Sequence, residues 1–186
     1  MKRAFDAVLA CLAIAALALP MAVIAALVKL TSRGPILYWS ARVGQDNRNF
    51  LMPKFRTMRV KTPQLATHLM TQPEKYLTPI GHFLRALSLD ELPQLYNILR
   101  GELSFVGPRP ALYNQDDLIA LRARKGIHRI LPGLTGWAQI NGRDELSIED
   151  KVAFDEHYLR HRSFFLDLKI IVLTFIKVLR AEGVKH

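Results

Sequence analysis

Two adjacent carboxylates, Asp90 and Glu91, are the side chains best suited to chemistry in this sequence. They begin a predicted helix over residues 91–99, with either Asp90 as its N-cap or Ser88 and Glu91 as a capping box. We favour Asp90, because Pro93 then falls at the third helical position, where its missing N–H costs nothing. A helix N-terminus stabilises carboxylates and attracts phosphate. Such a carboxylate suits a nucleophile for phosphorus or a ligand of Mg²⁺, and a solvated helix start is the plainer interpretation.

Basic side chains are concentrated ahead of this pair. Between residues 33 and 61 the only acid is Asp46, and the bases are Arg33, Arg42, Arg48, Lys54, Arg56, Arg59 and Lys61. Lys54 and Arg56 are two apart on a predicted strand and therefore point the same way, which suits a diphosphate clamp. Further on, Arg109 stands between two prolines, where a rigid loop would offer its guanidinium to phosphate. The alternatives are a solvated strand face and a surface turn.

The elements that must position these groups follow an apolar run from Ala7 to Val28. As a straight helix the run would extend about 33 Å, enough to cross a bilayer core. Pro20 interrupts it, and basic residues, which prefer the cytoplasmic side, flank both of its ends. A helix that enters the membrane, breaks at Pro20 and returns fits these facts. One kinked spanning helix is the alternative.

The remainder predicts a single domain without repeats or low-complexity linkers. Residues 36–43 and 49–58 are rich in β-formers around a turn at 44–47, which predicts a hairpin, and Pro53 indicates an edge or a bulge. We expect a Gly-punctuated loop over 132–143, and helices over 79–87, 91–99, 114–126, 147–162 and 164–181. The last helix is amphipathic, suited to the core or to a membrane surface.

Composition limits the class of protein. There are 26 Lys and Arg against 16 Asp and Glu, a net charge of +10, which suits nucleic acid, anionic lipid or a phosphorylated substrate. One cysteine, Cys11, excludes an internal disulfide and a cysteine-based zinc site. His157 and His161 lack a third metal ligand, and no Walker loop is present. A membrane-anchored nucleic-acid-binding protein and a non-catalytic scaffold remain competing hypotheses.

The order and spacing of the motifs resemble the bacterial sugar transferase family, the small monotopic phosphoglycosyl transferases. The match covers nearly the whole chain. The motifs that carry it are Lys2–Asp6 (KRAFD), Lys54–Met58 (KFRTM), Ser88–Gln94 (SLDELPQ), Val106–Pro110 (VGPRP), Pro132–Gln139 (PGLTGWAQ), Asn141–Arg143 (NGR) and Leu166–Lys169 (LDLK).

The resemblance implies an α+β fold that is mostly helical. Residues 1–33 would form a proline-broken re-entrant membrane helix and anchor, which favours the re-entrant alternative at Pro20. Residues 34–186 would form a compact catalytic domain with a β-hairpin and interfacial amphipathic helices. The protein would lie on the cytoplasmic face of the bacterial inner membrane, in contact with membrane lipids.

The resemblance also implies transfer of a sugar-1-phosphate from a UDP-sugar to undecaprenyl phosphate, the step that initiates glycoconjugate assembly. Asp90 would be the nucleophile that carries a covalent phosphosugar, and Glu91 a metal ligand or proton acceptor, with Mg²⁺ as the expected ion at both. Nucleic acid is not an expected partner, and the sugar and any oligomeric state stay open. The expected substrate-binding residues are Lys54, Arg56, Arg85, Arg109, Gln139, Arg143, Asp155 and Tyr158.

Overall fold

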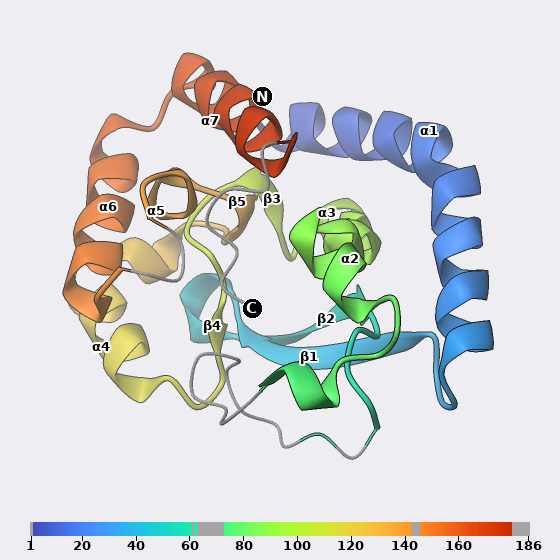
Figure 1. Ribbon diagram of the computed structural model, residues 1–186. Coiled ribbons are helices and arrows are strands. Elements are labelled where there is room, and N and C mark those ends of the chain that lie inside the picture. The colour runs from blue at the N-terminus through green and yellow to red at the C-terminus, as the bar shows by residue number, and fades with distance from the viewer. Residues whose placement is uncertain (1, 61, 63–72, 143–145, 180–186) are drawn as a thin grey trace.

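The computed structural model describes residues 2–60, 62, 73–142 and 146–179. Helix α1 (Lys2–Thr31) contains Pro20 and is the one helix among the described residues that is long and apolar enough to cross a membrane. Figure 1 shows α1 running along the top of the molecule and then turning down its right-hand side, around α3 and α2. The helix therefore wraps the domain and does not project from it.

The predicted hairpin is confirmed. Strands β1 (Leu37–Val43) and β2 (Asn49–Phe55) pair antiparallel, and the short 3-10 helix η1 (Gln45–Asn47) forms the turn. Strand β4 (Ala111–Leu112) joins the free side of β1, so that β2 is an edge strand. The edge position predicted from Pro53 is confirmed, because a proline has no N–H to give to a further strand.

A second, parallel pair joins β3 (Ser104–Val106) to β5 (Gly133–Thr135). Helix α5 (Trp137–Ile140) follows directly. The loop expected over residues 132–143 is therefore wrong for most of its length. Its glycines serve close backbone packing, because a Cβ on Gly133 would overlap the backbone of Gly107. The glycines that predicted a loop instead allow the backbones of the β3 and β5 segments to lie close together.

The other elements are helical and mostly follow the prediction. The helix expected over 91–99 is an exception, because it is split into the 3-10 helix η4 (Leu89–Gln94) and α3. The N-cap of η4 is Ser88, in a left-handed conformation with a φ of 54° and no side-chain cap. Neither Asp90 as an N-cap nor a capping box of Ser88 and Glu91 is therefore formed. The remaining bounds are η3 (Pro73–Tyr76), α2 (Gly81–Ala86), α3 (Leu95–Arg100), α4 (Asp116–Arg124), η5 (Ile127–Arg129), α6 (Ile148–His161) and α7 (Phe164–Leu179).

One face of α1 belongs to the core. Ala10 packs with residues of β2 and α3, and Ile24 and Val28 pack with Phe55 and Leu84. The opposite face is apolar and exposed, and Leu19 and Leu30 keep 75% and 82% of their surface. A long apolar helix with one buried and one open face suits contact with lipid along its length.

Both ends of α1 are tied to the same domain. At the start, Lys2 Nζ pairs with Asp167 Oδ2 at 2.5 Å, Arg3 donates to the last carbonyls of α3, and Asp6 accepts from Ser104 Oγ at 2.8 Å. At the other end, Arg56 binds the backbone just beyond α1. These contacts keep the two ends of the apolar helix on one body of protein.

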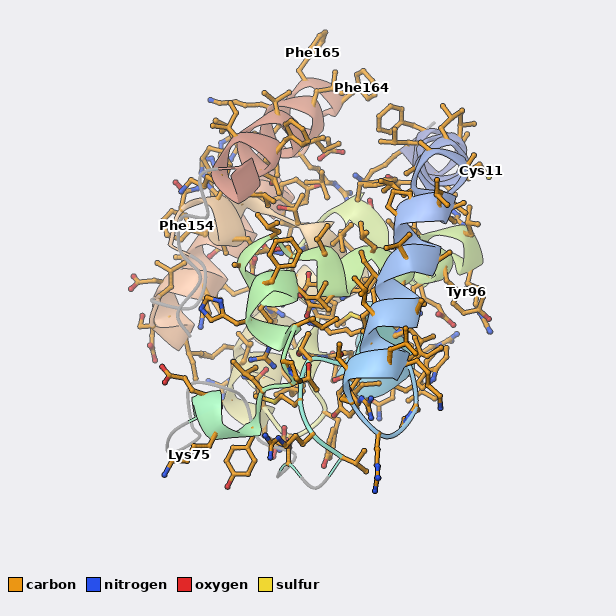
Figure 2. All side chains as sticks on the ribbon, turned by 45° about the vertical axis from the view of Figure 1, so that its right-hand side comes forward. Cys11, Lys75, Tyr96, Phe154, Phe164 and Phe165 are labelled. Atoms are coloured by element: carbon orange, nitrogen blue, oxygen red, sulfur yellow. The ribbon has the colours of Figure 1, made fainter. Side chains whose placement is uncertain are left out.

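The last described helix also presents an apolar face. Phe164 and Phe165 project from the outer end of α7 (Figure 2), and Phe165 is 82% exposed. Ile170 on the inner side is fully buried against the β3 region. The amphipathic character predicted for this helix is therefore confirmed, whereas its contact with a membrane stays a prediction.

Candidate active site

Three segments far apart in the sequence meet at Glu91. Lys54 comes from the end of β2, Glu91 from η4, and Arg109 from the loop between β3 and β4. Glu91 Oε1 accepts hydrogen bonds from Lys54 Nζ at 2.6 Å and from Arg109 Nη2 at 2.8 Å. The 3-10 turn places this carboxylate under the strand, where both cations reach it.

Asp90 occupies a different environment. It is 7% exposed, and no hydrogen bond or ion pair engages its carboxylate among the residues that the structure describes. Burial raises the pKa of Asp90, the Glu91 charge adds to that rise, and the positive charges of Lys54, Arg85 and Arg109 oppose it. An unpaired carboxylate beside three cations retains its oxygens for an incoming group.

Glu91 is held in its ionised form. Burial alone would raise the pKa of Glu91, but the charges and hydrogen bonds of Arg109 and Lys54 outweigh burial and hold that pKa well below its usual value. For Lys54, burial lowers the pKa of the ammonium although Glu91 acts against that shift. The two carboxylates thus have opposite pKa shifts, a pattern typical of groups with separate roles in a site.

Arg85 completes the cluster. Its Nε donates to Thr57 Oγ1 at 3.0 Å, which fixes the side chain between β2 and η4. The charge of Arg85 is close enough to lower the pKa of Asp90. The structure therefore brings Lys54, Arg85 and Arg109 together around the two carboxylates.

Arg56 lies elsewhere, which corrects the predicted clamp. Its Nη1 donates to the carbonyl of Arg33 at 2.5 Å, and its Nη2 donates to the carbonyl and hydroxyl of Ser32 at 2.8 and 2.7 Å. Lys54 instead bonds to Glu91. The two side chains leave neighbouring positions of one segment but serve different partners, because Arg56 lies just past the last residue of β2.

Asp155 and Tyr158 also differ from the expectation that they line the site. Asp155 is 1% exposed and pairs with Arg122, whose Nη2 lies 2.6 Å from Asp155 Oδ2. Tyr158 Oη donates to Asp167 Oδ1 at 2.7 Å and lies 3.2 Å from the carbonyl of Val106. Both side chains stand behind the Arg109 segment and support it, and neither contacts Asp90 or Glu91.

Two other predicted residues add less. The amide nitrogen and oxygen of Gln139 are buried and have no partner in the described part of the chain. Arg143 lies outside the described residues.

Sequence reasoning missed Arg122. It lies in the charged helix expected over 114–126, yet it is only 9% exposed. A signal was available, because Arg122 follows the buried Leu118 by four positions and therefore shares its face of α4.

The carboxylates limit how a metal is bound. Among the described residues no group of three or more His, Cys, Asp or Glu side chains lies close enough to hold an ion. Asp90 has oxygens without partners, whereas Glu91 Oε1 accepts from both Lys54 and Arg109. Mg²⁺ is commonly held by one or two carboxylates together with substrate phosphates. Asp90 has oxygens open for such a role, whereas Arg109 also approaches Glu91 Oε2, at 3.5 Å.

The chain belongs to the bacterial sugar transferase family, whose model matches residues 1–181. It is 44% identical to the undecaprenyl-phosphate glucose phosphotransferase of Komagataeibacter xylinus over 93% of this chain, but spans only 35% of that protein. It is 41% identical to the uncharacterized sugar transferase EpsL of Bacillus subtilis, covering 100% of this chain and 91% of EpsL. It is 40% identical to the UDP-glucose:undecaprenyl-phosphate glucose-1-phosphate transferase of Escherichia coli, covering 95% of this chain and 40% of that protein.

Proposed function

We propose that this chain transfers a sugar-1-phosphate from a UDP-sugar to undecaprenyl phosphate, giving a polyprenyl diphosphate sugar and UMP. Family membership and the names of the relatives support this class of reaction. The observation that carries the proposal is Asp90: a buried carboxylate without a hydrogen-bonding partner among the described residues, beside three cations. Such a group suits attack on a phosphorus whose oxygens the cations hold.

In the first step, an Asp90 carboxylate oxygen attacks the sugar-bearing phosphorus of the donor. A bond forms between that oxygen and phosphorus, the bond from phosphorus to the bridging oxygen breaks, and UMP leaves with the electron pair. The ammonium of Lys54 bonds to Glu91, and its other N–H donors have no partner in the described residues. These donors are suited to the donor's phosphate oxygens.

In the second step, a phosphate oxygen of the lipid attacks the same phosphorus and displaces the Asp90 carboxylate. The free enzyme is restored, and the product holds a new diphosphate linkage. Division into two steps means that the two anionic substrates need not be aligned at the same moment. Ionised Glu91 holds Lys54 and Arg109 in place through both steps.

Magnesium belongs to the proposal as well. Asp90 and Glu91 would hold the ion with the donor's diphosphate, and the open oxygens of Asp90 support that role. When bound, Mg²⁺ offsets negative charge on the transferring phosphoryl group.

The N-terminal helix would anchor this chemistry at the membrane without crossing it. Contacts of Asp6 and Arg56 hold both ends of α1 on one domain, and the outer face between them is apolar. A helix tied at both ends to one polar body suits re-entry, because a spanning helix would draw that body into lipid. Basic residues at both ends favour the cytoplasmic face.

The proposal is tested by UMP release from a panel of UDP-sugars with Mg²⁺ and undecaprenyl phosphate, for wild type and Asp90→Asn. UMP that depends on the lipid, comes from a particular donor and disappears in Asp90→Asn is the expected result. Full activity in Asp90→Asn would remove Asp90 as the nucleophile. Continued release of UMP without lipid, beyond the single equivalent per enzyme that the first step gives, would instead indicate hydrolysis of the sugar nucleotide.

A further inference from the structure

The segment Val106–Pro110, here named the Arg109 loop, is held by its carbonyl groups. The two prolines at its centre have no N–H to offer, so contacts of its oxygens must fix much of its course. The donors come from three separate parts of the fold. They are Gly133 N to Pro108 at 2.9 Å, Arg122 Nη1 to Arg109 at 2.7 Å and Arg42 Nη1 to Pro110 at 3.2 Å. Tyr158 Oη, which donates to Asp167, also lies 3.2 Å from the carbonyl of Val106.

Arg122 makes the shortest of these contacts, and its other nitrogens are fixed. Nε and Nη2 lie 2.9 and 2.6 Å from Asp155 Oδ2, and both side chains are buried. Because the guanidinium is rigid and planar, holding these nitrogens also fixes the direction in which Nη1 points. The carbonyl that Nη1 meets belongs to Arg109, the residue whose guanidinium binds Glu91.

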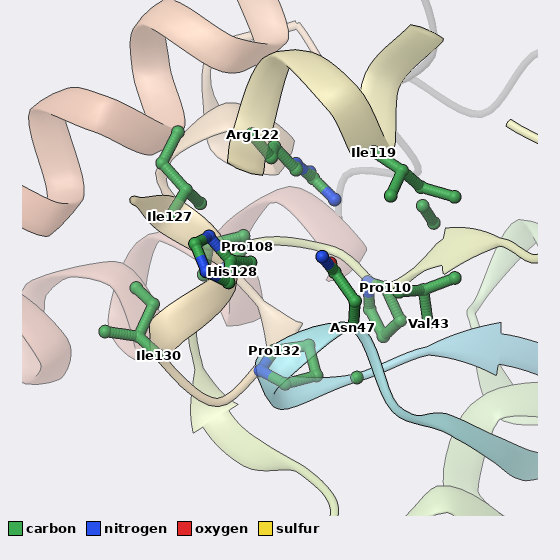
Figure 3. Close-up of a pocket in the computed structure, with 12 residues that line it drawn as sticks. Val43, Asn47, Pro108, Pro110, Ile119, Arg122, Ile127, His128, Ile130 and Pro132 are labelled. Atoms are coloured by element: carbon green, nitrogen blue, oxygen red, sulfur yellow. The ribbon is translucent and has the colours of Figure 1, made fainter. Parts of the chain in front are cut away.

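Figure 3 shows the place from which Arg122 acts. Its side chain extends from α4 into a cavity of about 30 Å³ that Pro108 and Pro110 also line. The space that remains beside these side chains is therefore small. Replacing Arg122 with a shorter group would therefore leave the loop facing a larger void at this point.

We propose that Arg122, fixed by Asp155, is a positioning residue that sets where Arg109 presents its guanidinium to Glu91. Asp155 and Tyr158 are three positions apart on one face of α6, and this helix contacts the start of the Arg109 loop through Tyr158 and supports Arg109 through the pair of Asp155 and Arg122. Displacement of a binding group by about 1 Å is enough to lower a rate by roughly 10²-fold. The catalytic part of this inference rests on the function proposed above.

A cycle of variants separates positioning from a general structural role. The variants are Arg122→Met, Arg109→Gln and the double variant, each assayed for UMP release as full-length protein. We expect Arg122→Met to lower kcat/KM by about 10²-fold in the wild-type background and by no more than about twofold when Arg109 is already Gln. The same factor in both backgrounds would overturn the proposal, since Arg122 would then act independently of Arg109.

A second pair of variants keeps the test valid if Arg122→Met folds poorly. Arg122→Met with Asp155→Leu replaces the buried ion pair by apolar side chains, an exchange that is often neutral for stability. We expect this double variant to recover the wild-type melting temperature while keeping the loss of activity. Recovery of activity together with stability would show that the pair serves folding alone, and would overturn the proposal.

Hydrogen exchange gives a readout that does not depend on activity. In the Arg122→Met, Asp155→Leu protein, we expect faster amide exchange across residues 104–113 than in wild type. Arg160→Gln is the matched control, because Arg160 lies on α6, as Asp155 does, but forms an exposed ion pair with Glu156. In this control, exchange across residues 104–113 should match that of wild type. Unchanged exchange in the double variant would refute positioning. If wild type released no UMP, the proposed function would fail, and this exchange would still decide whether Arg122 holds the loop.

Discussion

Substitution of Lys54 by Met tests the central ion pair of the site. Lys54 Nζ lies 2.6 Å from Glu91 Oε1, and the two side chains are only 16% and 11% exposed. Removing one partner of a buried pair costs about 3–5 kcal/mol when the other is left alone. Glu91 keeps Arg109, so we expect a smaller loss of stability, about 2 kcal/mol.

The same substitution changes the pH dependence of activity. Lys54 opposes the rise in the pKa of Asp90 that burial causes, so without Lys54 that pKa rises further. The proposed attack on phosphorus needs an ionised Asp90, and a higher pKa leaves less carboxylate at a given pH. The acid limb of the kcat/KM profile should therefore shift to higher pH, with a loss of about 10²-fold at neutral pH if Lys54 also binds phosphate.

The assay combines thermal melting in detergent with UMP release between pH 5.5 and about pH 9. Lys125→Met is the matched control, because Lys125 pairs with Glu156 at 3.1 Å on the surface and is 52% exposed. It should leave both readouts unchanged. A Lys54→Met protein as stable as the control, with an unshifted acid limb, would refute the assigned role of this ion pair.

Three further substitutions probe the frame around the site. Arg56→Met removes the donors to the backbone beyond α1 and should cost about 2 kcal/mol in thermal unfolding; an unchanged melting temperature would contradict that role. Gly133→Ala forces a Cβ into the backbone of Gly107, so we expect the free energy of unfolding to fall by at least about 2 kcal/mol and activity to fall with it. A variant as stable and active as wild type would count against this packing. Ser88→Val places a β-branched residue at a φ of 54° and should lower the free energy of unfolding by about 1–2 kcal/mol, whereas Ser88→Gly should be better tolerated. A higher melting temperature for Ser88→Val than for Ser88→Gly would refute backbone strain at this position.

Local patterns predicted the elements that local forces determine. The hairpin follows from β-rich runs around a polar turn. The helix expected over 147–162 forms as α6, and its N-cap Ser147 accepts from the backbone of Asp150. Both carry local signals that are visible without knowledge of distant contacts. The 3-10 turn at Asp90 could not be predicted in this way, because η4 packs against β2 and this tertiary contact overrides the local propensity for an α-helix.

The roles of single polar residues depended on the fold. Lys54 and Arg56 share a strand pattern, but only the three-dimensional course of the chain sends one to Glu91 and the other to the end of α1. Asp155 was placed in the site by resemblance, and its contacts put it behind the Arg109 loop. A motif marks a residue as required without telling whether it meets substrate or holds a neighbour.

The covalent role of Asp90 is tested most directly by isotope exchange without the lipid acceptor. Wild-type protein is incubated with a UDP-sugar that supports turnover, Mg²⁺ and labelled UMP, and label entering the UDP-sugar is measured. If Asp90 carries the phosphosugar, the first step reverses and label appears at a rate comparable to turnover, whereas Asp90→Asn gives none. Absence of exchange in a protein that turns over fully with undecaprenyl phosphate, or exchange that persists in Asp90→Asn, would contradict the account.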